Sequence, residues 1–505
     1  MKRGKCGLAF GLAAVLLIVG EPAGGRSRKR GNGVVLAEAR RRRPETPSPP
    51  LDTGPVGVLQ EIEEKDIRIG EKYNYNQALY LSNLFYEAQR AGKLPKDNRI
   101  PWRRDSNIAD GFLSHHDLSG GYYDAGDYII FGWPLASATT VLAWGLLEYE
   151  DAYTQTGELG HTLATVKWPL DWLLKAHVAP DTLYVQVGDG KVEHEYWGRP
   201  EFERKPRPAY KVNATHGGTE PMADAAAAMA AGYLVFQHHD PVYAQTLLFH
   251  AQQLFEAALA HPVTFTLSAP FYESSGFNDE IAWAAAWLYK ATGTNAYLTQ
   301  AMEFAELFEP DDAGAFGWDN KNAGVHLLLY KLTKLQKYAD NFTKYMSSWL
   351  PGSSSSIKRT PKGLAYYMSW GPLRWAANTA FLALLAADFG LAVQPYRRFA
   401  RSQIHYILGD NGGFSYVVGF GQKGPRAIHN RGASCGRHGC ECNNLPSANT
   451  LYGALVGGPD EKDMYFDDCH DYKHSECSVD YNAGYQGAVA GLKHLSLMGL
   501  LDSFE

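Results

Sequence analysis

Two carboxylates stand three residues apart in the stretch from Ser119 to Tyr128, where Asp124 and Asp127 flank an alanine and a glycine. Glycines permit a tight turn here, so both side chains can face one small volume. Two such carboxylates can hold and activate one water molecule, one accepting its proton while the other orients it. Taken alone, the segment is better explained as a simple Asp-Gly turn with a structural role.

A third acidic residue, Glu476, lies far along the chain among aromatic and polar residues, just before the last helical segment. Loss of hydration in an aromatic setting raises the pKa of a carboxylic acid, which then suits a proton donor to a leaving oxygen. The alternative interpretation is a plain glutamate in the first turn of a helix.

His429 and Arg431 follow a glycine-rich stretch, and their spacing of two lets both side chains point the same way from an extended strand. Such donors suit sugar hydroxyls, although a surface hydrogen-bonding role also explains them. Aromatic residues make up 13% of the chain and are dense in the same segments, and pyranose rings stack on aromatic faces. These aromatic candidates are Tyr122, Tyr123, Tyr196, Trp197, Tyr210, Trp318, Trp370 and Tyr481, of which Trp197 and Trp370 are preferred because most tryptophans are core.

The elements that must position these residues are helices. Twelve segments show apolar residues recurring at three and four, and strand-like alternation is scarce. They are 74–91, 134–156, 162–177, 219–238, 241–260, 278–292, 295–308, 321–333, 335–349, 371–389, 394–408 and 482–499. Long connections mostly follow the odd-numbered segments, whereas several of the even-numbered segments are followed by short connections. Short connections make antiparallel neighbours, so this pattern predicts six hairpins closed into a double ring. Every odd-to-even loop, and with them the candidate residues, then lies at one end.

The remaining composition bounds the class of protein. A chain of 505 residues that is 45% hydrophobic can bury a large core. Residues 1–25 have the layout of a secretory signal peptide, with an apolar run too short to span a membrane. Residues 26–67 form a basic and then proline-rich arm expected to be disordered, which leaves 68–505 as the catalytic domain.

The first 50 residues hold 11 of the 48 Lys and Arg but only 3 of the 54 Asp and Glu, so the rest of the chain is acidic. That charge argues against nucleic-acid binding.

Five cysteines remain beyond the signal peptide, and all flank the segments around His429 and Glu476: Cys435, Cys440, Cys442, Cys469 and Cys477. Secretion favours disulfides, and five thiols allow at most two bridges whose connectivity the sequence does not reveal. The irregular spacing does not favour zinc. Asn213 and Asn341 begin N-glycosylation sequons, which fits a secreted glycoprotein.

From about residue 72 to 500 the sequence resembles glycoside hydrolase family 9, the endo-β-1,4-glucanases built on an (α/α)6 barrel. Three motifs carry the resemblance: Gly-Gly-Tyr-Tyr-Asp-Ala-Gly-Asp ending at Asp127, the His-x-Arg segment at His429, and the aspartate–glutamate segment that ends at Gly484. Their order across some 400 residues makes coincidence negligible. The resemblance implies an all-α fold of twelve helices in six hairpins.

The resemblance also implies roles for individual residues. Asp127 is the general base, Asp124 helps to hold the water, Glu476 is the general acid, His429 binds sugar beside the scissile bond, and Asp467 organises the site locally. The substrate-binding set is Arg431, His194, Trp197, Tyr210, Trp370, Arg374 and Tyr481. No cofactor is needed for the chemistry, but a structural calcium is implied with the oxygen ligands Ser275, Asp279, Glu280 and Asp319. Asp279 and Glu280 are equally placed to cap a helix.

The sequence departs from the family pattern at three places. Asn430 stands where the family often has histidine, Cys469 where it often has arginine, and Ser475 where asparagine is usual. The missing arginine and the extra cysteines at 440 and 442 raise the hypothesis that a disulfide has taken over the local bracing. These departures bear on the activity level and the pH optimum rather than on the catalytic pair.

The family inverts, so Asp127 and Glu476 are expected about 6.5–9.5 Å apart, with room for a water between them. The favoured function is a secreted, monomeric endo-acting enzyme that binds β-1,4-glucan and has neither nucleic-acid nor membrane partners. The alternatives are an exo-acting β-glucosidase or glucosaminidase of the same fold and a non-catalytic carbohydrate-binding protein.

Overall fold

The chain divides into two compact units, residues 1–51 and 52–505. The computed structural model describes residues 67–68, 70–308, 314–352, 357–436, 439–443 and 446–501, all in the second unit. The predicted signal peptide (1–25) and, apart from Ile67, the predicted arm (26–67) lie outside these residues. Across the described part of the chain, the helices are too short or too polar to cross a membrane.

Twelve helices of the described part follow the predicted segments, and their contacts arrange them in two rings. The inner ring consists of α3 (Gly132–Glu148), α7 (Thr219–Phe236), α9 (Asn278–Thr292), α11 (Asn322–Thr333), α13 (Pro372–Asp388) and α16 (Val479–Leu497). Each packs on the next, and α16 returns to α3. The outer ring consists of α2 (Tyr75–Gln89), α5 (Leu159–Ala176), α8 (Pro241–Ala260), α10 (Asn295–Ala305), α12 (Gln336–Trp349) and α14 (Val393–His405). The predicted (α/α)6 barrel is confirmed.

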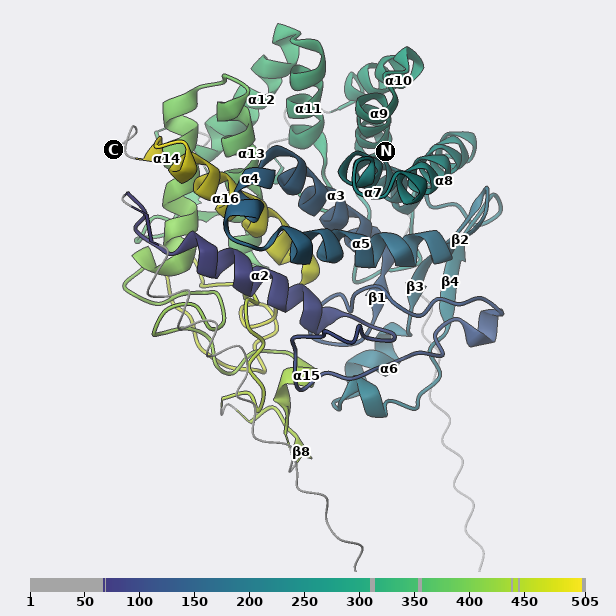
Figure 1. Cartoon of the computed structure of the whole chain (residues 1–505), viewed down its shortest axis with the longest axis horizontal. Coiled ribbons are helices and arrows are strands. Elements are labelled where there is room, and N and C mark those ends of the chain that lie inside the picture. Colours follow the sequence, from purple (N-terminus) through teal and green to yellow (C-terminus); the bar gives the residue numbers. More distant parts are fainter. Residues whose placement is uncertain are drawn as a thin grey trace, which may run out of the picture. The chain divides into compact units, whose positions relative to one another are not determined.

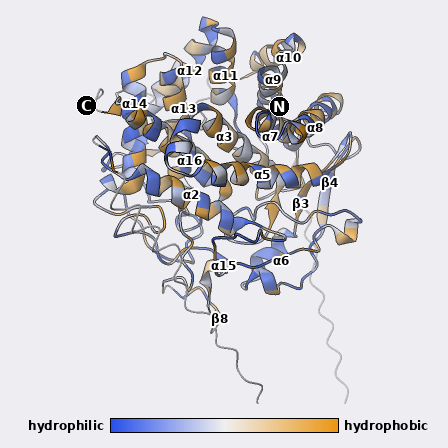
Figure 2. Cartoon of the chain, in the orientation of Figure 1, coloured by the Kyte–Doolittle hydropathy of each residue, from blue (hydrophilic) through white to orange (hydrophobic). Residues whose placement is uncertain are grey.

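The composition of the helices explains which ring they join. Inner helices are buried nearly all round and rich in small residues, such as the fully buried run Ala225–Ala228 of α7. Gly487 of α16 lies so close to Phe381 of α13 that a Cβ there would be 2.7 Å from its ring. Outer helices such as α2 and α14 carry both hydrophilic and hydrophobic residues, whereas α3 and α7 are mostly hydrophobic (Figure 2). The apolar stripe of α14 matches burial on one face, whereas α2 is buried along its whole length.

One predicted helix is interrupted. The segment 134–156 is α3 followed by α4 (Glu150–Gln155), because Tyr149 between them leaves helical geometry with φ −132° and ψ 34°. Tyr149 is buried against Phe381 and donates its hydroxyl to Asp388. This packing turns the chain toward α5.

A small antiparallel sheet, which the sequence did not predict, lies beside the inner ring. Its strands are β1 (Ile130–Phe131), β2 (His177–Ala179), β3 (Thr182–Val187) and β4 (Ala209–Val212), and β3 pairs with each of the other three. β1 is only two residues long and shows no pattern, whereas β3 does alternate, with Leu183, Val185 and Val187 at every second position, and this signal was overlooked. The other paired strands are β5 (Lys358–Arg359) with β6 (Ala365–Tyr366) and β7 (Cys435–Gly436) with β8 (Gly439–Cys440).

Each outer helix leads to the next inner helix through a loop at the same end of the rings, as expected from the loop lengths. In the described part of the chain these loops comprise 90–131, 177–218, 261–277, 306–308 with 314–321, 350–352 with 357–371, and 406–436 with 439–443 and 446–478. They contain the short helices α6 (Gly190–Glu195) and α15 (Arg431–Ser434) and the single turns η1 (Phe112–Ser114), η2 (Pro200–Phe202) and η3 (Tyr406–Asp410). In Figure 1, α6, α15 and β1 lie together beneath the rings.

Candidate active site

Backbone hydrogen bonds join the three predicted motifs at this end. The Gly126 N–H donates to Oε1 of Glu476 over 3.1 Å. The Arg431 N–H donates to the Gly126 carbonyl over 2.9 Å, and the His429 N–H donates to the Ser475 carbonyl over 3.0 Å. The turn that carries Asp124 and Asp127 therefore lies directly against the segment that carries Glu476.

Gly126 is required for this close approach. A Cβ at this position would lie 2.4 Å from the His429 carbonyl oxygen and 2.8 Å from Oε1 of Glu476. Any side chain would push apart the two segments. The glycine of the Asp-Ala-Gly-Asp motif is therefore needed for the contact between these segments as well as for the geometry of the turn.

Glu476 has the environment of a proton donor. Only 18% of its side chain is exposed. Burial raises the pKa of the Glu476 carboxyl to about 8, and the negative charge of Asp127 adds to this, while Arg431 and the Gly126 N–H oppose it. The carboxyl therefore keeps its proton at neutral pH.

Asp124 is also buried and is held by a tyrosine that the sequence analysis missed. Oδ2 accepts a 2.6 Å hydrogen bond from the Tyr272 hydroxyl, and Oδ1 has no protein partner in the described part of the chain. Burial raises the pKa of Asp124 to about 8 against the effect of the Tyr272 hydrogen bond, with a further contribution from Asp127. Tyr272 comes from the 261–277 loop, an odd-to-even loop whose Phe-Tyr pair was the available signal.

Asp127 is 6% exposed, and its two oxygens have different partners. Oδ1 accepts from the Ile129 N–H over 3.1 Å, and Oδ2 lies 3.1 Å from Nδ1 of His194 on α6. The same Nδ1 is 2.7 Å from the Gly190 carbonyl, so it carries a hydrogen. The imidazole stacks on Phe271 with ring centroids 4.8 Å apart.

His429 is held in one neutral tautomer. Its Nδ1 lies 2.6 Å from the Cys469 carbonyl, which can only accept, so Nδ1 carries the hydrogen. Burial lowers the pKa of His429 to about 4, although the Cys469 hydrogen bond opposes this. Nε2 is therefore unprotonated, and it lies 4.0 Å from Oε1 of Glu476.

The predicted extended strand is confirmed at His429 and Asn430 but is wrong at Arg431. Asn430 caps α15 by accepting from the Ala433 N–H, and Arg431 is the first residue of that helix. The Arg431 guanidinium donates to the carbonyls of His194 and Tyr196 over 3.0 Å each. The N-cap formed by Asn430 therefore makes Arg431 helical, although its spacing of two from His429 favoured an extended strand.

Aromatic rings form a continuous row across this end of the protein. Trp197 contacts His429 with centroids 5.3 Å apart, His429 is 6.2 Å from Tyr472, and Tyr472 is 5.4 Å from Trp370. Tyr472 and Trp370 are 47% and 41% exposed. Trp197 and Trp370 were predicted from the sequence, but Tyr472, which lies within the aspartate–glutamate segment, was not.

Other predicted substrate-binding residues are less accessible. Arg374 is 7% exposed, pairs with Asp480 over 2.7 Å, and lies 4.8 Å from the ring of Tyr481, which is itself buried. Tyr210 on β4 donates to Asp189, the N-cap of α6. Contact of these three predicted residues with substrate stays a prediction.

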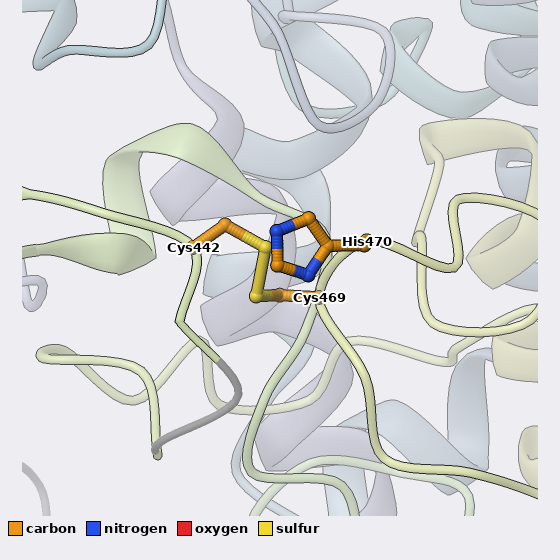
Figure 3. A group of neighbouring side chains, drawn as sticks. All are labelled: Cys442, Cys469 and His470. Carbon is orange, nitrogen blue, oxygen red and sulfur yellow. A yellow bond between two sulfur atoms is a disulfide. The ribbon is translucent and has the colours of Figure 1, made fainter.

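Two disulfides stand beside the site. They join Cys435 to Cys440 and Cys442 to Cys469, and Cys477 is a buried thiol. Figure 3 shows His470 against the Cys442–Cys469 bridge, a grouping with metal-site spacing. Because the two sulfurs are bonded to each other in the disulfide, neither can be the thiolate that a zinc ion binds.

Asp467 braces the segment that leads to His429. Its two oxygens accept from the N–H groups of Arg426 and Ala427 over 2.8 and 2.9 Å. Together with the Cys469 carbonyl, these bonds fasten the 467–469 segment to the 426–429 segment.

The predicted calcium ligands lie at the start of α9 and before α11. Asp279 accepts from the Lys321 N–H, and Asp319 accepts from the Ser275 N–H. Both oxygens of the fully buried Glu280 have no hydrogen-bond partner in the described part of the chain, and Oε1 is 3.8 Å from Nζ of Lys321. Such unsatisfied hard oxygens fit a calcium ion. The three carboxylates are not gathered within 4.8 Å of one another, however, and Asp279 and Glu280 also occupy the first turn of α9.

A double ring of helices that presents a protonated carboxyl, two further carboxylates and a row of aromatic rings at one end defines a glycoside hydrolase. The chain belongs to glycosyl hydrolase family 9, whose sequence model matches residues 75–489.

Its relatives are named endoglucanases. The chain is 43% identical over 443 residues to endoglucanase A of Bacillus pumilus, covering 84% of this chain and 67% of that protein. It is 39% identical over 464 residues to endoglucanase 15 of Arabidopsis thaliana, covering 83% and 93%. Among solved structures, an endoglucanase from the termite Nasutitermes takasagoensis is 44% identical with a TM-score of 0.81, covering 84% of this chain and all of that one. Endoglucanase CelQ from Clostridium thermocellum, solved with cellotriose, is 35% identical with a TM-score of 0.78, covering 85% and 71%.

Proposed function

We propose that the protein is an inverting endo-β-1,4-glucanase in which Glu476 is the general acid and Asp127 the general base. The observation that carries this proposal is the contact of Glu476, protonated at neutral pH, with the turn that bears Asp124 and Asp127. The endoglucanase relatives and the cellotriose bound to CelQ support a β-glucan substrate.

The different environments of Glu476, Asp124 and Asp127 give each carboxyl a different role in the reaction. Glu476 gives its proton to the glycosidic oxygen as the bond from that oxygen to the anomeric carbon breaks. Asp124 stays protonated up to about pH 8, so it orients the attacking water through its free Oδ1 rather than taking the proton. Asp127 is left to accept the proton as the water oxygen bonds to the anomeric carbon. The anomeric configuration inverts because water attacks opposite the leaving group.

The aromatic row binds the glucan chain. Trp197, Tyr472 and Trp370 offer faces on which pyranose rings stack. The unprotonated Nε2 of His429 accepts a hydrogen bond from a sugar hydroxyl near the scissile bond. Arg431 holds the carbonyls of the segment that carries His194 and Trp197, so it shapes this end of the row.

Several further features belong to the same proposal. The protein is secreted through the 1–25 signal peptide, carries the 26–67 arm ahead of the 68–505 catalytic domain, and acts as a glycosylated monomer. A calcium ion held by Asp279, Glu280, Asp319 and Ser275 would stabilise the loops before α9 and α11 and take no part in the chemistry.

The test of function uses carboxymethylcellulose. An endo-acting enzyme lowers its viscosity far faster than it releases reducing ends. We expect Glu476→Gln and Asp127→Asn each to lose at least about 1,000-fold in kcat, and Asp340→Asn, on the outer face of α12, to retain wild-type activity. Wild-type protein that releases glucose with little loss of viscosity would indicate an exo-acting enzyme. A wild-type rate no higher than that of Glu476→Gln would indicate a binding protein.

The stereochemistry is tested separately. NMR spectroscopy of a cello-oligosaccharide digest is expected to show the α-anomer first, as the separation of about 6.5–9.5 Å predicted between Asp127 and Glu476 requires. Initial formation of the β-anomer would mean a covalent intermediate and would overturn the inverting mechanism.

A further inference from the structure

Arg207 lies just before β4, close to α6, with only 6% of its side chain exposed. Its guanidinium makes a forked pair with Asp110, Nε to Oδ1 over 2.8 Å and Nη2 to Oδ2 over 3.2 Å. Nη1 donates to Glu193 over 2.6 Å and approaches Glu203 at 3.5 Å. Nη2 also donates to the Tyr128 carbonyl over 2.8 Å. All five N–H groups of the guanidinium therefore have an acceptor.

Two of these acceptors adjoin the site. Tyr128 directly follows Asp127, and Glu193 directly precedes His194. Oδ2 of Asp127 and Nδ1 of His194 are 3.1 Å apart. One rigid guanidinium thus links the two chain segments whose side chains meet at the general base.

We propose that Arg207 is a positioning residue that sets the contact between Asp127 and His194, an inference that rests on the proposed role of Asp127. The planar fork of arginine holds Glu193, Tyr128 and Asp110 at fixed angles to one another, which an ammonium group cannot do. The role requires no contact between Arg207 and substrate.

The surrounding charges show why arginine is needed here. Three buried carboxyls, Asp110, Glu193 and Glu203, face this one cation. Burial and the charge of the neighbouring Glu203 raise the pKa of Glu193 against the effect of Arg207. Removing the cation would leave the remaining carboxylates unpaired in the interior.

The test compares Arg207→Lys with Asp110→Asn as a matched control. Both variants disturb the same buried cluster, but only Arg207→Lys loses the link between Tyr128 and Glu193. Steady-state kinetics on a soluble cello-oligosaccharide are measured well below the lower Tm of the two. For Arg207→Lys we expect kcat to fall about 10- to 100-fold with KM within about threefold of wild type. For Asp110→Asn we expect kcat within about threefold of wild type at a comparable loss of Tm.

A kcat for Arg207→Lys no lower than that of Asp110→Asn overturns the proposal, because the cluster then acts on stability alone. If Arg207→Lys does not fold, Glu193→Gln removes only the α6 arm of the link and must show the same selective loss of kcat. Asp127→Asn is measured alongside. Full activity of that variant overturns the general-base assignment and the Arg207 role together, whereas an inactive Asp127→Asn with an unaffected Arg207→Lys overturns the Arg207 role only.

Discussion

Replacing Gly126 by alanine tests the packing that joins the two halves of the site. The new Cβ would lie 2.4 Å from the His429 carbonyl oxygen, whereas ordinary van der Waals contact begins at 3.4 Å. The turn and the His429 segment must therefore separate by about 1 Å. Because Oε1 of Glu476 would be 2.8 Å from the same Cβ, this movement also disturbs the hydrogen bond from the Gly126 N–H to the acid.

The expected magnitude follows from these distances. A misplacement of about 1 Å between catalytic groups can lower kcat about 100-fold. Overpacking a tight contact costs about 1–3 kcal/mol of unfolding free energy, so the variant still folds. The loss of activity should thus greatly exceed what the loss of stability explains.

The assay is the rate of reducing-end release from carboxymethylcellulose, with Tm followed by circular dichroism. Gly160→Ala in α5 is the control, because no atom lies within 4 Å of its added Cβ and alanine favours the helix by about 0.5–1 kcal/mol. It should keep wild-type activity and a Tm at least as high. Activity of Gly126→Ala within about threefold of wild type would refute the reasoning, since the 126–429–476 contact would then tolerate separation.

Four further outcomes are expected. The kcat/KM should fall about tenfold per pH unit above pH 8, because the Glu476 carboxyl, whose pKa is about 8, must be protonated to act. That pKa lies above the usual 4.5, so stability is lost as pH rises from 4.5 to about 8, because the carboxyl then ionises in the unfolded chain but keeps its proton in the folded protein. Glu476→Gln should accordingly raise the free energy of unfolding by on the order of 2 kcal/mol at pH 8 but hardly at pH 4 in urea titrations; an equal effect at both values would contradict this. Cys442→Ser, or reduction of the wild type, should lower the unfolding free energy by about 3 kcal/mol. The same change should lower kcat by about tenfold, because the Cys469 carbonyl holds the His429 ring. An undiminished kcat would show that the bridge does not position His429. Chelation by EGTA should lower Tm and added calcium restore it, whereas Glu280→Gln should abolish this response; a Tm unaffected by EGTA would argue against calcium.

Helices were predictable from the sequence because their signals are local. The predicted segment 241–260 coincides with α8, where Asp240 caps the first turn and Pro241 begins it. The unequal loop lengths were enough to predict which helices pair and at which end the long loops gather. The failures were also local in origin. The strand at 130–131 is only two residues long, the alternation within 182–187 was overlooked, and the capping side chain of Asn430 starts a helix at Arg431, where an extended strand was expected.

What the sequence determined by itself was therefore the double ring of helices and the types of residue at one of its ends. Only the tertiary structure decided which atoms meet there: the Gly126 N–H with Glu476, the Tyr272 hydroxyl with Asp124, and Cys469 with Cys442. The physical reason is that these contacts join loops without a regular period, whose neighbours depend on how the inner helices converge. The raised pKa of Glu476 has the same origin, because it comes from the loss of hydration that arises only when distant segments close over the carboxyl.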